Sequence, residues 1–289
     1  MDFAGFILQL LNGLQFAMLL FLLAVGLSIV FGLMNFINLA HGTLYMVGAF
    51  VGYSAARYWG SYWLALVAGT AAAALAGAVF YATLLRRMQT ASPMKQVLVT
   101  FGLIFVGIDA VRLVWGDNTQ SIVTPRLLAG GIEIFGESYP VYRLFIIGLG
   151  LATALLLYIG LERTRLGATV RAGVDDREMA TSLGLNVDLA FFIVFCLGCG
   201  LAGMAGVVAA PVLQIYPGMD IAVLIPALIV VVVGGPGRLG GAFLGALLIG
   251  IAATFGNVLA PTFASFIIYG VMAAVLVLRP GGLLAPRHR

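Results

Sequence analysis

Charge is scarce in this sequence. Only 9% of the 289 residues are charged, whereas about 25% are charged in a typical soluble domain. Hydrophobic residues make up 62% of the chain, and the mean hydropathy is +1.12. Several apolar runs exceed the roughly 18–20 residues that cross a bilayer as a helix. Since these runs are too long and too evenly apolar for barrel strands, the sequence predicts a polytopic all-α membrane protein without a free-standing soluble domain.

Residues and motifs that carry catalysis are also scarce. No G-x-x-x-x-G-K-[ST] motif occurs, so the chain lacks a P-loop with which to bind ATP. Matches to G-x-G-x-x-G at 198–203 and 235–240 follow no strand of a βαβ unit and predict no dinucleotide site. Cys196 and Cys199 fall inside an apolar run, which favours helix packing over redox or metal chemistry. We therefore expect no enzyme activity, no metal and no cofactor in this chain.

The apolar runs predict about eight or nine transmembrane helices in a single domain, 1–289. Their approximate limits are 8–33, 37–56, 62–85, 95–115, 140–161, 188–212, 220–235, 239–257 and 262–279. The seventh and eighth runs are shorter and are also compatible with one re-entrant pair.

The placement of lysine and arginine predicts the orientation, because cytoplasmic loops are enriched in these residues. If the 162–187 segment is cytoplasmic, 11 of the 15 basic residues share its side. Only Arg57, Arg112, Arg126 and Arg143 then lie on the other side. This arrangement puts the N-terminus outside and the C-terminus in the cytoplasm, and it requires an odd number of crossings. The net charge of +4 thus reflects topology, and we expect no nucleic-acid partner.

A polar stretch interrupts the apolar sequence near the start of the second run. Asn35, Asn38 and His41 are spaced three residues apart, and Gly42 and Tyr45 follow. Polar groups at membrane depth normally face a bundle interior or a cavity, and interrupted segments in both halves of a transporter point to its pathway. With 226–241 as the counterpart, we predict a broken or re-entrant segment in each half and a translocation pathway beside 35–45. A purely structural hydrogen-bond cluster is the alternative.

The 162–187 segment is the longest charged stretch on the predicted cytoplasmic side. Gly167 and Gly184 flank a stretch of mixed charge that predicts one short amphipathic helix. If this segment served only to set the membrane topology, its arginines would suffice, and its acidic residues would have no role. We expect instead a helix that docks in a cleft of a cytoplasmic partner. The residues expected to serve this contact are Arg171, Asp175, Asp176, Arg177, Glu178, Ala180, Leu183 and Gly184.

A second charged pair lies near the predicted outer end of the 95–115 run. Asp109 and Arg112 are one helical turn apart, and this spacing favours a local ion pair. The rival interpretation is a proton-carrying carboxylate. It would make the protein a cation-coupled secondary transporter or a small-solute channel, neither of which needs a docking helix.

Three stretches resemble the membrane permease of branched-chain amino-acid type ABC importers. GLSIVFGLMNFINLAHGTLYMVGAFVGY is similar to that family's first signature. RTRLGATVRAGVDDREMATSLGLNVD, with LAGMAGV beyond it, resembles its cytoplasmic coupling loop, and VVVGGPGRLGGAFLGALLIG resembles a third signature. The length and the NLAHG form resemble the shorter of the two permeases that such importers pair together.

The resemblance implies a function and a set of partners. It implies a permease subunit in a bacterial plasma (inner) membrane that pairs with a second homologous permease. Two cytoplasmic ATPase subunits would bind the ATP, and an extracytoplasmic substrate-binding protein would deliver the cargo. Members of this family carry branched-chain amino acids, urea and short amides, or aromatic acids, so the exact substrate stays open.

Gly237, Gly241 and Gly245 are spaced four residues apart. This spacing predicts a ladder on one helix face that lets another helix approach closely. In a two-permease importer the ladder packs either inside the subunit or against the sister permease. We favour internal packing, because the ladder adjoins the predicted second break.

Overall fold

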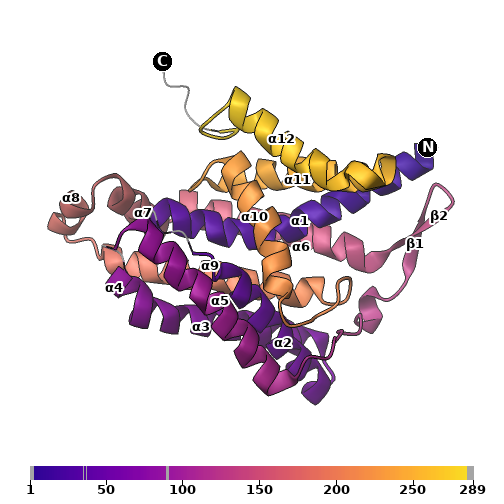
Figure 1. The fold of residues 1–289 in the computed structure, drawn as a ribbon, viewed down its shortest axis with the longest axis horizontal. Coiled ribbons are helices and arrows are strands. Elements are labelled where there is room, and N and C mark those ends of the chain that lie inside the picture. The colour runs from indigo at the N-terminus through magenta and orange to yellow at the C-terminus, as the bar shows by residue number, and fades with distance from the viewer. Residues whose placement is uncertain (1–2, 35, 37, 89–90, 285–289) are drawn as a thin grey trace.

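The computed structural model describes residues 3–34, 36, 38–88 and 91–284 as a bundle of helices with one small hairpin (Figure 1). In the first half, the helices are α1 (Phe3–Met34), α2 (His41–Trp59), α3 (Tyr62–Phe80), α4 (Arg86–Met88) and α5 (Pro93–Trp115). A π-helical turn, η1 (Tyr81–Leu85), joins α3 to α4, and a 3-10 turn, η2 (Arg126–Leu128), precedes the strands β1 (Gly131–Ile134) and β2 (Glu137–Pro140).

The second half is helical as well. It contains α6 (Val141–Glu162), α7 (Arg165–Asp175), α8 (Arg177–Ser182), α9 (Val187–Ala209), α10 (Met219–Gly234) and α11 (Leu239–Leu259). A 3-10 turn, η3 (Pro261–Phe263), leads into α12 (Ala264–Leu278).

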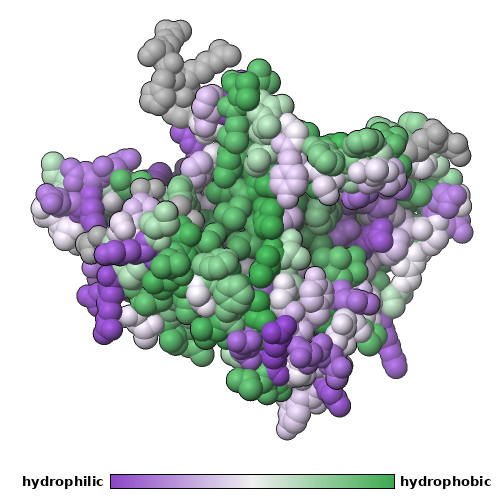
Figure 2. Space-filling view, in the orientation of Figure 1, coloured by the Kyte–Doolittle hydropathy of each residue, from purple (hydrophilic) through white to green (hydrophobic). Residues whose placement is uncertain are grey.

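Seven of the described helices are long and apolar enough to cross a membrane. α2 is not among them, and α10 has only 16 residues. These helices overlap the predicted runs, with ends that differ by a few residues, which confirms the polytopic all-α class. Figure 2 shows a broad apolar face, with hydrophilic groups at the end that carries α8 and at the opposite end.

α1 forms the centre of the bundle. It packs against α9 and α11 and also contacts α6 and α10, and every residue from Ala17 to Val30 is buried. Small residues allow this close approach: a Cβ on Gly250 of α11 would lie 2.6 Å from the Ala17 Cα of α1. On the other side of α9, a Cβ on Gly48 of α2 would lie 2.3 Å from the Gly203 Cα. Without a hydrophobic drive between helices in lipid, such contacts supply the packing energy.

The β1–β2 hairpin is absent from the sequence-based prediction. Its strands pair antiparallel, with Gly131 opposite Pro140 and Ile134 opposite Glu137. Phe135 and Gly136 form the turn with φ values of 53° and 86°, a conformation that glycine adopts easily and phenylalanine rarely does. Four-residue strands in a polar connection produce little hydropathy signal, which explains why the hairpin was missed.

The irregular segments between helices differ in part from the prediction. The chain leaves helical geometry between α1 and α2, as expected. In the second half, however, α10 continues through Pro226 to Gly234, so 226–234 is unbroken helix. The irregular part of the predicted 226–241 segment is 235–238, where Gly235 and Gly237 have φ values of 92° and 76°. Residues 210–218 before α10 are largely irregular as well.

Candidate translocation and coupling sites

The break between α1 and α2 places polar side chains in the middle of the bundle. Asn38 and His41 are both 0% exposed. Neither the Asn38 amide nor the two His41 ring nitrogens has a hydrogen-bond partner among the described residues. Backbone bonds close the turn, because the Asn38 carbonyl accepts from the His41 N–H at 3.3 Å. Asn35, the third polar residue of the predicted pathway, lies outside the described residues.

His41 lies where three helices meet. A Cβ on Gly26 of α1 would stand 2.9 Å from His41 Nε2 and 2.5 Å from the Gly198 carbonyl oxygen of α9. Glycine at this crossing therefore leaves the space that the imidazole occupies. Tyr45, one turn further along α2, is also buried, and its carbonyl oxygen would be 2.1 Å from a Cβ on Gly206 of α9. The predicted pathway residues of α2 are thus enclosed by α1 and α9.

A buried carboxylate joins this region from the second half. Asp220 is 1% exposed, and its Oδ2 accepts a hydrogen bond from the Thr43 hydroxyl at 3.0 Å. Its Oδ1 has no hydrogen-bond partner among the described residues. A Cβ on Gly42 would lie 2.7 Å from the Asp220 carbonyl oxygen. The starts of α2 and α10 therefore meet inside the bundle, which is the arrangement of discontinuous helices that often borders a transport pathway.

Asp220 is not among the predicted pathway residues, because it stands at the first position of the predicted 220–235 span. A residue at a span boundary is ordinarily solvated. The available signal was its position two residues after Gly218, where an acidic residue complements the N-terminal end of a helix dipole. Gly218 has φ of 95°, and its N–H donates to the Met46 sulfur at 3.4 Å, so this helix begins against α2.

The Asp109–Arg112 ion pair is confirmed. Arg112 Nη1 lies 3.5 Å from Asp109 Oδ1, and Arg112 Nε lies 2.8 Å from Asp117 Oδ1. The Asp109 side chain is 71% exposed. This carboxylate is a surface group of α5 and does not lie on an internal proton path.

The predicted coupling segment contains two helices where one was expected. α7 ends at Asp175, and Asp176 caps α8 by accepting a hydrogen bond from the Met179 N–H at 2.9 Å. An aspartate that bonds a backbone N–H three residues ahead starts a new helix, so the sequence DDRE divides the segment. Gly167 lies inside α7, where a Cβ would come within 1.9 Å of the Leu161 carbonyl oxygen. Gly167 therefore allows α7 to pack closely against the end of α6, and it does not mark the end of a helix.

Two arginines tie this segment to the membrane helices on either side. Arg171 of α7 donates to the Leu161 carbonyl oxygen and lies 3.5 Å from Glu162, both at the end of α6. Arg177 of α8 pairs with Asp188 in the first turn of α9, and its guanidinium lies 6.0 Å from the Phe191 ring centroid. The remaining predicted residues divide by exposure: Ala180 is buried, whereas Asp175, Glu178, Leu183 and Gly184 are exposed.

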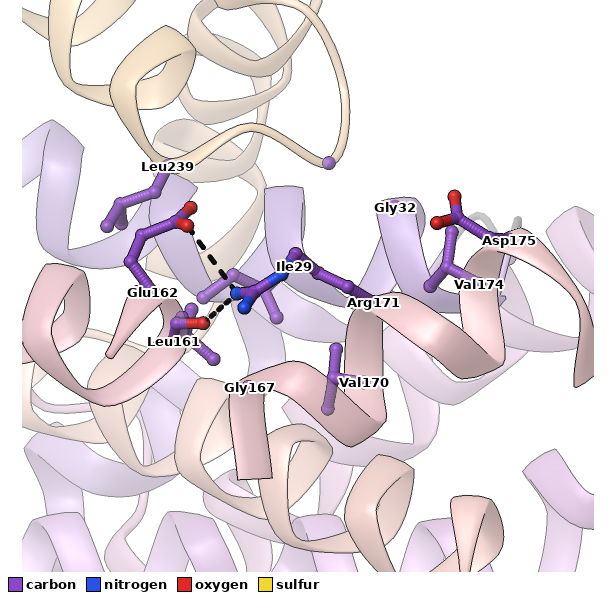
Figure 3. A pocket seen from close by; sticks show the side chains of 11 residues that line it. Ile29, Gly32, Leu161, Glu162, Gly167, Val170, Arg171, Val174, Asp175 and Leu239 are labelled. Atoms are coloured by element: carbon purple, nitrogen blue, oxygen red, sulfur yellow. Dashed lines mark hydrogen bonds and ion pairs between the residues drawn. The ribbon is translucent and has the colours of Figure 1, made fainter. Parts of the chain in front are cut away.

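Figure 3 shows the cavity that forms where α7 meets α1 and α6. The Arg171 side chain extends across it toward Glu162 and Leu161, and Asp175 lies at the far end. The cavity has a volume of about 220 Å³. Gly32 and Gly237 also line it, so the turn before α11 reaches the coupling segment.

The predicted glycine ladder is wrong at its first residue. Gly237 precedes α11 and has a left-handed φ, and a Cβ there would lie 2.7 Å from the Gly32 Cα of α1. Its N–H donates to the Ser28 carbonyl oxygen at 3.1 Å. Gly241 and Gly245 are on α11, where added Cβ atoms would lie 2.2 Å and 2.6 Å from the carbonyl oxygens of Gly234 and Val230 on α10. The structure therefore places both glycines against a helix of the same chain.

These features define a class. Apolar helices that enclose a polar break, with a charged segment tied to two of the spans, are the architecture of a multi-pass membrane permease. The family model for the branched-chain amino acid transport system permease component matches residues 9–276. The chain belongs to this family.

Several named proteins are similar in sequence to nearly the whole of this chain. BraD, a high-affinity branched-chain amino acid transport system permease protein of Pseudomonas aeruginosa, is 30% identical over 96% of this chain and 94% of its own length. LivH of Escherichia coli K12, which has the same description, is 26% identical over 98% and 96%. A probable LivH of Methanocaldococcus jannaschii is 26% identical over 93% and 87%. The solved structure of PsaBC from Streptococcus pneumoniae in complex with Fab aligns at 16% identity with a TM-score of 0.49, too weak a likeness to transfer any property.

Proposed function

We propose that this chain is one permease subunit of an ATP-driven importer for branched-chain amino acids or related small solutes. Its partners are a second homologous permease, two cytoplasmic ATPase subunits that bind the ATP, and an extracytoplasmic substrate-binding protein. It lies in a bacterial plasma membrane with the N-terminus outside and the C-terminus in the cytoplasm. Family membership supports the transport function, and the relatives' descriptions support the substrate class.

The coupling mechanism is supported by two arginine contacts that connect the coupling segment to the neighbouring membrane helices. Arg171 connects α7 to the end of α6, and Arg177 connects α8 to the start of α9. An ATPase that moves this segment therefore moves both spans as attached bodies. Rigid-body motion of packed elements is a general means of switching a protein between two states.

α9 would carry this motion to the polar break. It packs along α1, α2 and α3, and its Gly198 and Gly206 lie beside His41 and Tyr45. A displacement of α9 relative to α1 changes the space around His41 and Asn38. We infer that these buried polar side chains border the pathway, and that they become accessible to the cargo when α9 moves.

The coupling role is tested with Glu178→Arg. Glu178 is exposed on α8, so its replacement leaves the fold intact but reverses the charge presented to an ATPase. We expect transport to be abolished in proteoliposomes that hold the assembled importer, while the subunit inserts normally. Glu133→Arg on the β1–β2 hairpin, also exposed, is the matched control. Normal uptake with Glu178→Arg would refute the docking role.

The pathway role is tested with Asn38→Leu and His41→Leu. Each removes buried polar atoms that have no partner among the described residues, so the helices need not lose a hydrogen bond between them. We expect impaired uptake with normal assembly with the ATPases. An assembled variant with unchanged uptake would show that these groups neither line the pathway nor maintain it.

The substrate class requires a direct comparison. We expect ATP-dependent uptake of labelled leucine, isoleucine or valine when the matching binding protein is added. Urea, a short amide and an aromatic acid are the alternatives that this family admits. Transport of one of these in place of leucine would refute the proposed substrate class, but the chain would still be assigned as a permease.

A cation-coupled secondary transporter is the second candidate, and Asp220 is the observation that favours it. A carboxylate inside a membrane bundle is the usual component of a proton or ion relay. This function predicts uptake by the chain alone, driven by an ion gradient without ATPase subunits, and its loss in Asp220→Asn but not in Asp109→Asn. The proposed importer predicts no uptake without ATPases and ATP.

A further inference from the structure

A second cavity lies at the same end of the bundle as the coupling segment. It has a volume of about 380 Å³ and opens between η1–α4 and the start of α9. Three charged side chains line it, Arg86, Arg177 and Asp188. Tyr81, Leu189 and Phe192 contribute an aromatic and aliphatic wall.

The charges of this cavity do not balance. Arg177 is engaged by Asp188. Arg86 is exposed and has no hydrogen-bond or ion-pair partner among the described residues. One positive charge is therefore left over, on a guanidinium that stays protonated at any physiological pH and binds phosphate oxygens bidentately.

The surroundings of Arg86 are those of a membrane–water interface. The apolar stretch Tyr62–Met88 has 27 residues, about 40 Å of helix against roughly 30 Å of hydrocarbon. Its last turns therefore extend into the head-group layer. Leu189 is 52% exposed beside them, so the cavity has an exposed apolar wall at this level.

The π-helical turn η1 shapes the cavity from the α3 side. Short π-helical turns inside α-helices are frequently found at functional sites, and this one lies directly before Arg86. Within it, the Tyr81 ring packs against Phe192 and Phe195 with centroids 5.3 Å and 5.5 Å apart. α3 is thereby fixed to α9 on one side, while Arg86 is turned toward the cavity.

We propose that this cavity binds the phosphate of an anionic phospholipid, with Arg86 as the phosphate ligand and the acyl chains along Leu189 and Phe192. Basic pockets between membrane helices are general binding sites for anionic head groups. The exposed apolar wall, with Leu189 and Phe192, favours a lipid over a free phosphate. Arg177 lines the same cavity, so the bound lipid would lie next to the tie between α8 and α9. The proposal requires only that the chain lies in a membrane, and it does not depend on the importer function.

The test uses the full-length chain, purified in detergent and stripped of lipid. Phosphatidylglycerol, phosphatidylcholine or inorganic phosphate is added to the wild type, Arg86→Gln and Arg87→Gln. Arg87 is the matched control, because it is the next residue of α4, is equally basic and does not line the cavity. Bound lipid is measured by native mass spectrometry, and stabilisation by the shift in thermal unfolding midpoint.

We expect phosphatidylglycerol to bind and stabilise the wild type and Arg87→Gln, and phosphatidylcholine to do neither. Arg86→Gln should bind it about fivefold more weakly, the effect of one basic residue at an anionic interface. Arg86→Lys should recover part of the binding, which separates charge from folding. Equal lipid retention by Arg86→Gln and Arg87→Gln would overturn the site. A midpoint shift with inorganic phosphate equal to that with phosphatidylglycerol would overturn the lipid assignment.

Discussion

The hydroxyl of Thr43 joins two parts of the chain that are 177 residues apart. It donates to Asp220 at 3.0 Å in the buried centre of the bundle. A carboxylate in such a place is costly unless it is hydrogen-bonded. The starts of α2 and α10 are consequently held together by a polar contact.

Thr43→Val should therefore destabilise the subunit. It keeps the side-chain shape but leaves Asp220 without its side-chain partner, at a cost of about 1–3 kcal/mol. We expect a lower thermal unfolding midpoint in detergent. Thr83→Val is the control, because Thr83 of η1 is exposed and its hydroxyl donates to the nearby Val79 carbonyl at the end of α3. Equal midpoints for the two variants would show that the Thr43–Asp220 bond has no structural importance.

Only some of the buried polar residues could be predicted from the sequence. Asn38 and His41 were expected to be polar groups inside the bundle, and both are buried, because a polar residue within an apolar run has few other places to go. Asp220 was not recognised. Its partner is distant in the chain, and a single sequence contains no signal for such a pairing.

At the scale of elements, the coupling segment is held by exposed ion pairs. The Arg177 and Asp188 side chains are 49% and 64% exposed, and such pairs contribute about 0.2–1 kcal/mol. Their effect on global stability is therefore small. Their mechanical effect is larger, since they connect α8 to α9.

Arg177→Asp should lower ATP-driven uptake severalfold with little change in the unfolding midpoint, because the connection is lost while the core is intact. Asp188→Arg should do the same. The double variant with both changes restores opposite charges and should recover part of the uptake. Arg165→Gln, at the exposed start of α7, is the control. Absence of any recovery in the double variant would refute the connecting role of the pair.

Helix packing gives a second prediction at this scale. Gly241→Leu introduces a side chain where even a Cβ would lie 2.2 Å from the Gly234 carbonyl oxygen. We expect loss of the folded subunit when it is expressed alone, measured by size-exclusion chromatography. Gly148→Leu is the control, because a Cβ at that position would meet no atom of the described residues within 4 Å apart from its chain neighbours and the backbone of its own helix. A stable lone Gly241→Leu subunit that fails to pair with a sister permease would instead assign this face to the interface.

At the scale of the whole molecule, the predicted orientation rests on the distribution of lysine and arginine. The hydrophilic groups at the α8 end contain the segment that was assigned to the cytoplasm (Figure 2). Lys95→Cys should react with a membrane-impermeant maleimide only from the cytoplasmic side, and Arg57→Cys only from outside. The native Cys199 is fully buried and should not react. The reverse labelling pattern would invert the topology.

The bundle as a whole was predictable because crossing a membrane requires long apolar helices, and these dominate the sequence. The predictions that were wrong concern local backbone geometry. The division of the coupling segment at Asp176 depends on one capping hydrogen bond, and the place of Gly237 before α11 depends on a left-handed φ. Periodicity and hydropathy are insensitive to both.

The central position of α1 has a consequence for biogenesis. α1 leaves the ribosome long before its packing partners α9 and α11, which begin at residues 187 and 239. Its long apolar sequence lets it remain in lipid alone during that interval. The small residues on its faces, however, stay uncovered until most of the chain has been made. Nascent chains that stop before α11 should therefore be inserted but unpacked, and should be the preferred substrates of membrane proteases.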